Sequence, residues 1–83
     1  MKIGQPLLKL LNKIYAPAQV VPLRFGRYDL AMQTDRQGRP ILLFIGQRGD
    51  DGKIKGDRFT RRLLTDEQGN VLKDHWDYKG KTN

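Results

Sequence analysis

Two stretches of this chain have similar sequences, and that similarity constrains the fold more than any other feature. Residues 27–41 read RYDLAMQTDRQGRPI and residues 58–72 read RFTRRLLTDEQGNVL, at a constant offset of 31. Each copy reads as a strand that runs into a polar turn and out again. Gly supplies the positive φ that such turns need, and Asp hydrogen-bonds local backbone. The pattern predicts two β-hairpins of like register, whether by duplication or by coincidence of turn chemistry.

Pairing residues across each turn predicts the register. We expect Thr34 to face Arg39 and Thr65 to face Asn70, because this choice gathers apolar side chains on one face. The predicted pairs on that face are Met32–Ile41, Leu30–Leu43, Tyr28–Ile45, Leu63–Leu72, Phe59–Trp76 and the opposite charges Arg61–Asp74. The predicted pairs on the other face of the second hairpin are Arg58–Asp77, Thr60–His75, Arg62–Lys73 and Leu64–Val71. A slip by one residue would scramble both sets.

The remaining segments complete one domain, residues 1–83. Residues 5–15 predict a short amphipathic helix behind Pro6, and residues 16–26 predict a connector in which Gln19–Phe25 can add an edge strand. A Gly-rich charged loop, 48–56, then joins the hairpins 27–47 and 57–78, and a polar tail follows at 79–83. The predicted fold is α+β, with the helix packed on a four-stranded antiparallel β-meander, or a five-stranded one if the connector pairs. A small half-open barrel of SH3 or OB type is the alternative.

The composition limits the chemistry that this chain can perform. It has no Cys and no Ser, and a single His. These counts exclude disulfides, Ser–His or Cys–His nucleophile pairs and a site with several histidine ligands. We therefore expect no enzyme, with no catalytic residue, no metal site and no cofactor. No stretch approaches the length of a membrane span, and Lys9, Asn12 and Lys13 interrupt the apolar run that a signal peptide needs. We expect a cytoplasmic protein.

The face away from the predicted core is the candidate binding surface. The strand 41–45 is apolar on both sides, so a helix or a partner is expected to cover its outer face. Arg62 and Lys73 are expected to face each other, which costs stability unless an anion lies near them. His75 is expected to be an ordinary surface residue. The candidate surface residues are Leu42, Phe44, Lys53, Lys55, Arg58, Arg62, Lys73 and His75.

Two functions fit this surface. The first is a non-catalytic interaction module that binds a protein partner, or a second copy of itself, through the apolar centre of the open sheet face. The second is a nucleic-acid or other polyanion binder that uses the same face and the loop lysines, as the net charge of +7 favours. Binding that weakens steeply with salt would favour the second function over the first.

Overall fold

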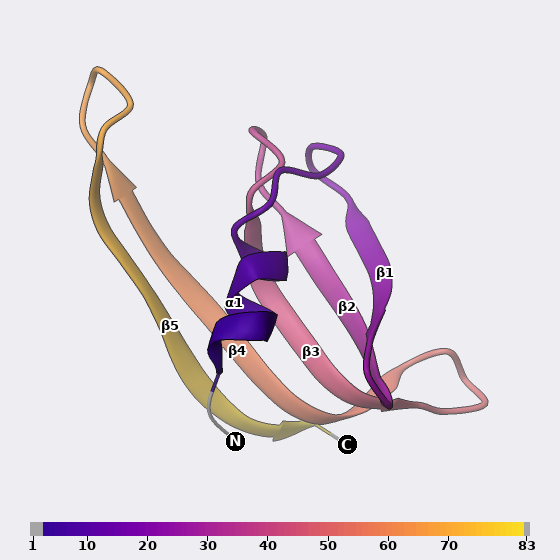
Figure 1. The fold of residues 1–83 in the computed structure, drawn as a ribbon. Helices are drawn as coiled ribbons and strands as arrows, with labels where there is room; N and C mark the ends of the chain where they lie inside the picture. Colours follow the sequence, from indigo (N-terminus) through magenta and orange to yellow (C-terminus); the bar gives the residue numbers. More distant parts are fainter. Residues whose placement is uncertain (1–2, 83) are drawn as a thin grey trace.

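The computed structural model, which describes residues 3–82, consists of one helix and one five-stranded antiparallel sheet (Figure 1). The elements are α1 (Gln5–Leu11), β1 (Val20–Phe25), β2 (Tyr28–Thr34), β3 (Pro40–Arg48), β4 (Ile54–Thr65) and β5 (Val71–Thr82). The strands pair in the order of the chain, β1-β2-β3-β4-β5. The α+β meander is therefore confirmed, and the connector supplies the fifth strand at one edge. The half-open barrel is not seen, because β1 and β5 form opposite edges of the sheet.

The helix packs on one face of the sheet and forms the core with it (Figure 1). Leu7 and Leu11 lie against alternate residues of the central strands, which are Leu30, Met32, Leu43, Ile45 and Phe59. All seven side chains are at most 3% exposed. The helix spans only two turns and would not be stable alone, so this burial holds it in place. We call this the helix face and the opposite side the open face.

The hairpins have the predicted faces but not the predicted partners. Both registers are displaced by two residues, so that Met32 pairs with Leu43 and Phe59 pairs with Tyr78. At each turn the outgoing strand pairs one residue later than predicted: Thr34 pairs with Pro40 and not with Arg39, because the Asp35 N–H already bonds the Arg39 carbonyl, at 2.9 Å. A bulge then adds one residue to the outgoing strand of each hairpin, at residues 41 and 72. The change at the turn and the bulge each displace the pairing by one residue. Together they displace it by two, which restores the alternation of the strand, so apolar side chains keep their face.

The predicted loop 48–56 is much shorter in the structure. β3 continues to Arg48 and β4 begins at Ile54, and Gly46 pairs directly with Gly56. A methyl group at Gly46 would overlap the carbonyl oxygen of Lys55, so the close approach of these strands requires glycine. These glycines therefore serve strand pairing and not a loop. The predicted tail is also wrong for residues 79–82, which continue β5, while Asn83 lies outside the described residues.

The helix ends earlier than the predicted 5–15. Asn12 is its C-cap, and its N–H bonds the Leu8 carbonyl at 2.9 Å. The chain then turns toward the first hairpin, where the Tyr15 N–H bonds the Gly38 carbonyl at 2.8 Å. Ile14 is consequently 66% exposed and takes no part in the apolar stripe. A tertiary hydrogen bond thus takes the N–H group that a longer helix would have used.

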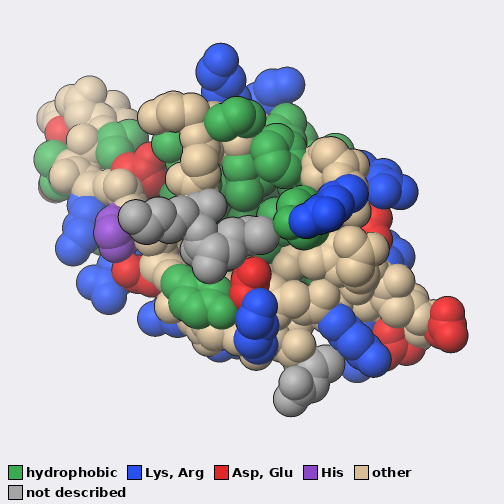
Figure 2. Space-filling view, turned by 60° about the horizontal axis from the view of Figure 1, so that its bottom comes forward, with side chains coloured by type: hydrophobic (Ala, Val, Ile, Leu, Met, Phe, Trp, Pro, Cys, Tyr) green, Lys and Arg blue, Asp and Glu red, His purple; other side chains and the backbone are tan. Residues whose placement is uncertain are grey.

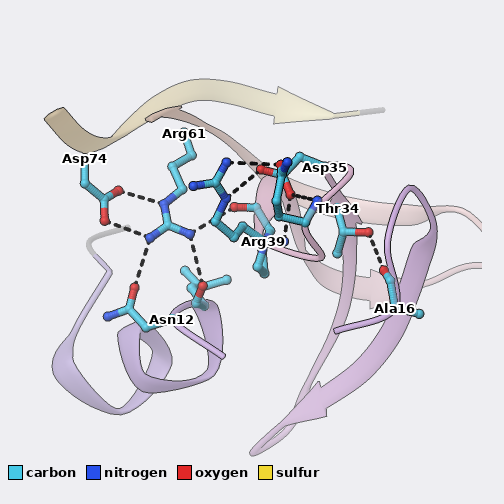
Figure 3. Close-up of polar contacts among 10 residues, drawn as sticks. Asn12, Ala16, Thr34, Asp35, Arg39, Arg61 and Asp74 are labelled. Atoms are coloured by element: carbon cyan, nitrogen blue, oxygen red, sulfur yellow. Dashed lines mark hydrogen bonds and ion pairs between the residues drawn. The ribbon is translucent and has the colours of Figure 1, made fainter. Parts of the chain in front are cut away.

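Arg61 connects the second hairpin to the rest of the molecule (Figure 3). Its side chain is 6% exposed and makes two bonds of 2.7 Å with the Asp74 carboxylate. It also donates to the carbonyls of Leu11 and Pro40, at 3.2 and 3.1 Å, and to Asn12 Oδ1 at 3.1 Å. The predicted Arg61–Asp74 pair is confirmed, although Arg61 lies opposite Trp76 and reaches Asp74 diagonally. One side chain therefore ties the hairpin to α1 and β3.

Candidate interaction surface on the open face

Leu42 and Phe44 lie at the centre of the open face, as the alternation of β3 requires. Both are half-buried, while their neighbours Leu43 and Ile45 are buried under the helix. Phe44 pairs with Ala31 on one side and with Arg58 on the other. The helix covers the opposite face and leaves this part of β3 without an apolar cover among the residues described.

A groove of about 310 Å³ runs beside Phe44. Its walls combine apolar side chains with two cationic residues, Arg48 and Lys53. The Arg48 guanidinium donates to the Gly52 carbonyl at 2.7 Å, and this bond holds the β3–β4 turn at the rim. The apolar lining residues on this face are Val20, Ala31, Phe44 and Ile54. Such a lining can hold an apolar side chain whose flanking groups are anionic.

The cations along the second hairpin are partly neutralised by Asp77. Arg62 faces His75, and Lys73 faces Leu64, so the predicted Arg62–Lys73 repulsion is wrong. Arg62 Nε lies 2.9 Å from Asp77 Oδ2, an ion-pair distance without hydrogen-bond geometry. Figure 2 shows the same mixture, with Asp or Glu side chains among the Lys and Arg side chains that border the histidine. The displaced register thus removes one argument for an anion on this face.

His75 is a surface residue, as predicted. Its side chain is 60% exposed, and its Nε2 lies 2.9 Å from Asp77 Oδ1. Asp77 also forms an ion pair with Arg62. The chain contains neither Ser nor Cys that this imidazole could activate. The contact with Asp77 orients the imidazole of His75 at the surface.

The two loop lysines of the candidate surface lie on different sides of the sheet. Lys53 lines the groove beside Phe44. Lys55 pairs with Gln47 and alternates with Asp57 and Phe59, so it belongs to the helix face. Leu42, Phe44, Lys53, Arg58, Arg62, Lys73 and His75 therefore share the open face, but they are spread along it: Lys53 lies beside the first residue of β4, whereas Lys73 and His75 lie opposite Leu64 and Arg62 near its other end.

Arg48 and Ile54 are groove residues that the sequence interpretation missed, because it placed both in a loop. The alternation from Ile54 to Thr60 carried the signal: Ile54, Gly56, Arg58 and Thr60 fall on one face, and Lys55, Asp57 and Phe59 on the other. Val20 lies in the stretch Gln19–Phe25 that the sequence allows as an edge strand, and it enters the groove because this strand, β1, pairs with β2.

Asp57 is a buried carboxylate on the helix face, 6% exposed. The Lys81 ammonium group at 2.9 Å holds the pKa of Asp57 below its usual value, against the opposing effect of burial. The Tyr78 hydroxyl donates to the same oxygen at 2.9 Å, and this bond raises the pKa of Tyr78. These two contacts connect Asp57 of β4 with Tyr78 and Lys81 of β5.

A second groove, of about 430 Å³, separates α1 from β5 on the helix face. Ile3, Leu8 and Trp76 line its apolar side. Arg61 lies over the ring of Trp76, with its Cζ 5.4 Å from the ring centroid. The groove therefore lies between α1 and the second hairpin, beside the Arg61 side chain that connects them.

Within residues 3–82 no helix has the length and apolar character needed to cross a bilayer. The same residues contain no group of three or more His, Asp or Glu side chains placed to share a metal ion. No protein-family model, curated protein or solved structure matches this chain. The fold and the open face are therefore the basis for a functional proposal.

Proposed function

We propose that this chain is a non-catalytic interaction module that binds a protein partner, or a second copy of itself, through the open face of its sheet. The observation that carries the proposal is the position of Phe44, half-buried beside an apolar groove on the face that the helix leaves uncovered. Aromatic side chains at the centre of a surface patch supply a large share of binding energy in protein interfaces. The partner that fits presents an apolar side chain flanked by carboxylates, opposite Arg48 and Lys53.

Site-specific photo-crosslinking tests this proposal. A photoreactive residue replaces Phe44 in one variant and Lys9, which is exposed on the helix, in a matched control. The partner should crosslink from position 44 and not from position 9. With the purified partner, Phe44→Ala should then lower the affinity at least about tenfold, while Lys9→Ala changes it less than about twofold. Equal crosslinking from both positions would contradict the proposal.

Binding of single-stranded nucleic acid or another polyanion is the second candidate function. It is supported by the pairing of Phe44 with Arg58, since an aromatic ring beside cations can stack a base and neutralise its phosphate. The Asp77 carboxylate on the same face opposes polyanion binding, because it repels a phosphate group. Fluorescence anisotropy with a labelled oligonucleotide distinguishes the two candidates. Three phosphate contacts predict a loss of affinity of roughly twentyfold between about 50 and about 200 mM salt, whereas an apolar protein interface is much less sensitive.

A further inference from the structure

The two hairpin turns have the same geometry as well as similar sequences. Asp35 Oδ1 accepts the backbone N–H groups two and four residues later, at 2.9 Å each. Asp66 Oδ1 makes the same two bonds at 2.9 and 2.8 Å. Gly38 and Gly69 both have positive φ, at 82° and 85°. The backbone groups that one turn presents are therefore presented by the other turn as well.

The first turn is occupied by another part of the chain. Residues 15–19 cross it through a turn of their own, with Ala18 at a positive φ of 52°, and β1 then continues antiparallel to β2. Tyr15 N–H donates to the Gly38 carbonyl and Ala18 N–H to the Asp35 carbonyl, at 2.8 Å each. The Thr34 hydroxyl donates to the Ala16 carbonyl at 2.7 Å (Figure 3). Thr34 is only 4% exposed as a result.

The equivalent positions of the second turn are open. β4 pairs with β3 only as far as Thr60, so within residues 3–82 its stretch Arg62–Thr65 has β5 as its single strand neighbour. Thr65 is exposed, and a methyl group at Gly69 would meet no described atom within 4 Å. Figure 1 shows this end of the hairpin projecting beyond the other strands. Its exposed apolar side chains are Leu64 at 58%, Val71 at 57% and Leu72 at 69%.

The two turns differ in charge. The first carries Arg36 and Arg39 beside Asp35, while the second has Glu67 and Asn70 at the equivalent positions. No Lys or Arg occurs between Thr65 and Leu72. The second turn is therefore an acidic tip next to exposed apolar side chains, and it is complementary to a segment that carries a cation near an apolar stretch.

We propose that the outer part of the second hairpin, residues 61–74, is a docking site for a segment of a partner protein with basic and apolar residues, extended where it pairs with β4. The segment adds antiparallel to the free edge of β4, crosses the turn as residues 15–19 cross the first turn, and places its basic end against Asp66 and Glu67. Addition of a strand to a free sheet edge is an established mode of peptide recognition, with affinity from main-chain hydrogen bonds. A hairpin without a third strand is marginally stable, so such a segment also stabilises this end of the arm. This site is separate from the groove beside Phe44.

The chain itself supplies the probe for a test. A synthetic peptide with the sequence of residues 13–23 carries Lys13, the segment that crosses the first turn and part of β1. Titrated into the ¹⁵N-labelled full-length protein, it should shift the amide signals of residues 62–72. Thr65→Val should weaken binding by about fivefold to tenfold, because one hydrogen bond is lost. Thr34→Val is the matched control, and it should leave the peptide affinity unchanged although it destabilises the fold.

The charge dependence provides a second readout. A peptide with Lys13→Glu should bind several-fold more weakly to the wild-type protein, and Glu67→Lys in the protein should restore its binding. Three results would overturn the proposal. The first is an absence of shifts at millimolar peptide, and the second is a set of shifts confined to residues 20–39, which would mean exchange with the chain's own β1. The third is binding that is indifferent to both Thr65→Val and Glu67→Lys.

Discussion

The two hairpins use one turn chemistry in two surroundings. In the first, β1 pairs along one side of β2 and β4 pairs along the outer side of β3, and the helix covers Leu30 and Met32 completely. In the second, the outer half stands apart, with Leu64 and Leu72 exposed to solvent. The difference shows that the turn sequence determines the local conformation, while the neighbouring segments determine how much of each hairpin is buried.

The connection between the hairpins and the core also differs. The first hairpin is held by many apolar contacts, since its strands supply four of the seven residues of the buried cluster. The outer half of the second depends on the Arg61 side chain, which bonds Asp74, Asn12 and two carbonyl groups. Apolar burial is spread over many atoms, whereas a polar connection of this kind rests on one group. We therefore expect the second hairpin to be the more easily disrupted by a single substitution.

Arg61→Met should have the largest effect. It removes a buried cation and leaves the carbonyls of Leu11 and Pro40 without their donor, so we expect a loss of about 3–5 kcal/mol in the free energy of unfolding. Arg62→Met is the matched control, because Arg62 is 60% exposed and its ion pair lies on the surface, where such pairs contribute less than about 1 kcal/mol. Urea denaturation measures both. Equal losses in the two variants would show that the Arg61 connection does not hold the arm.

Gly38→Ala should have the next largest effect on stability. The matched control is Gly69→Ala, at the equivalent position of the second turn. Both residues have positive φ, so alanine is strained at either position by about 1 kcal/mol. At Gly38 the added methyl group would also overlap the carbonyl oxygen of Tyr15 and displace the segment that crosses the turn. We expect a total loss of about 2–3 kcal/mol there, against about 1 kcal/mol at Gly69. If thermal unfolding gives the same loss for both, the segment does not pack on the first turn as the structure describes.

The comparison also explains which parts of the fold could be predicted from sequence. Alternation along the strands fixes which side chains share a face, and the prediction that Tyr28, Leu43, Phe59 and Trp76 lie together is confirmed, since all four are in the core cluster or pack against it. Partner assignments were wrong because they depend on the number of turn and bulge residues. That number is set by hydrogen bonds such as Asp35 N–H to the Arg39 carbonyl, for which the residue pattern allows more than one arrangement.

The candidate surface was predictable to the same extent. Leu42 and Phe44 were placed on the open face because alternation alone determines it. The pairing of Arg62 with His75 and its ion pair with Asp77 could not be predicted, because both follow from the exact register of β4 and β5. The end of the helix was missed for a different reason: the Tyr15–Gly38 bond joins residues that are far apart in the sequence. Periodicity within one segment holds no information about such a contact.

The smallest expected difference between the two hairpins is in the titration of their turn aspartates, Asp35 and Asp66. Burial raises the pKa of Asp35, but hydrogen bonds from Arg39 and Gln37 outweigh it and hold the pKa below its usual value. Hydrogen bonds from Asn70 are the main cause of the lowered pKa of Asp66. Because both values are depressed on folding, each carboxylate stabilises the fold above the unfolded pKa of about 3.9, and this contribution is lost as the pH falls through the folded value.

The two carboxylates should differ in their response to salt, because the partner of Asp35 is charged and that of Asp66 is neutral. The Asp35 carboxylate lies 2.9 Å from Arg39 Nε, whereas Asp66 accepts from the Asn70 amide at 3.2 Å. Side-chain ¹³C signals followed from pH 6 to pH 2 should therefore show that salt raises the midpoint of Asp35 and barely moves that of Asp66. Asn70→Arg should make the second turn behave as the first does. If the midpoints of Asp35 and Asp66 still respond differently to salt in the Asn70→Arg variant, Arg39 is not the cause of the difference. The segment 15–19, which covers the first turn, would then determine how the pKa of Asp35 responds to salt.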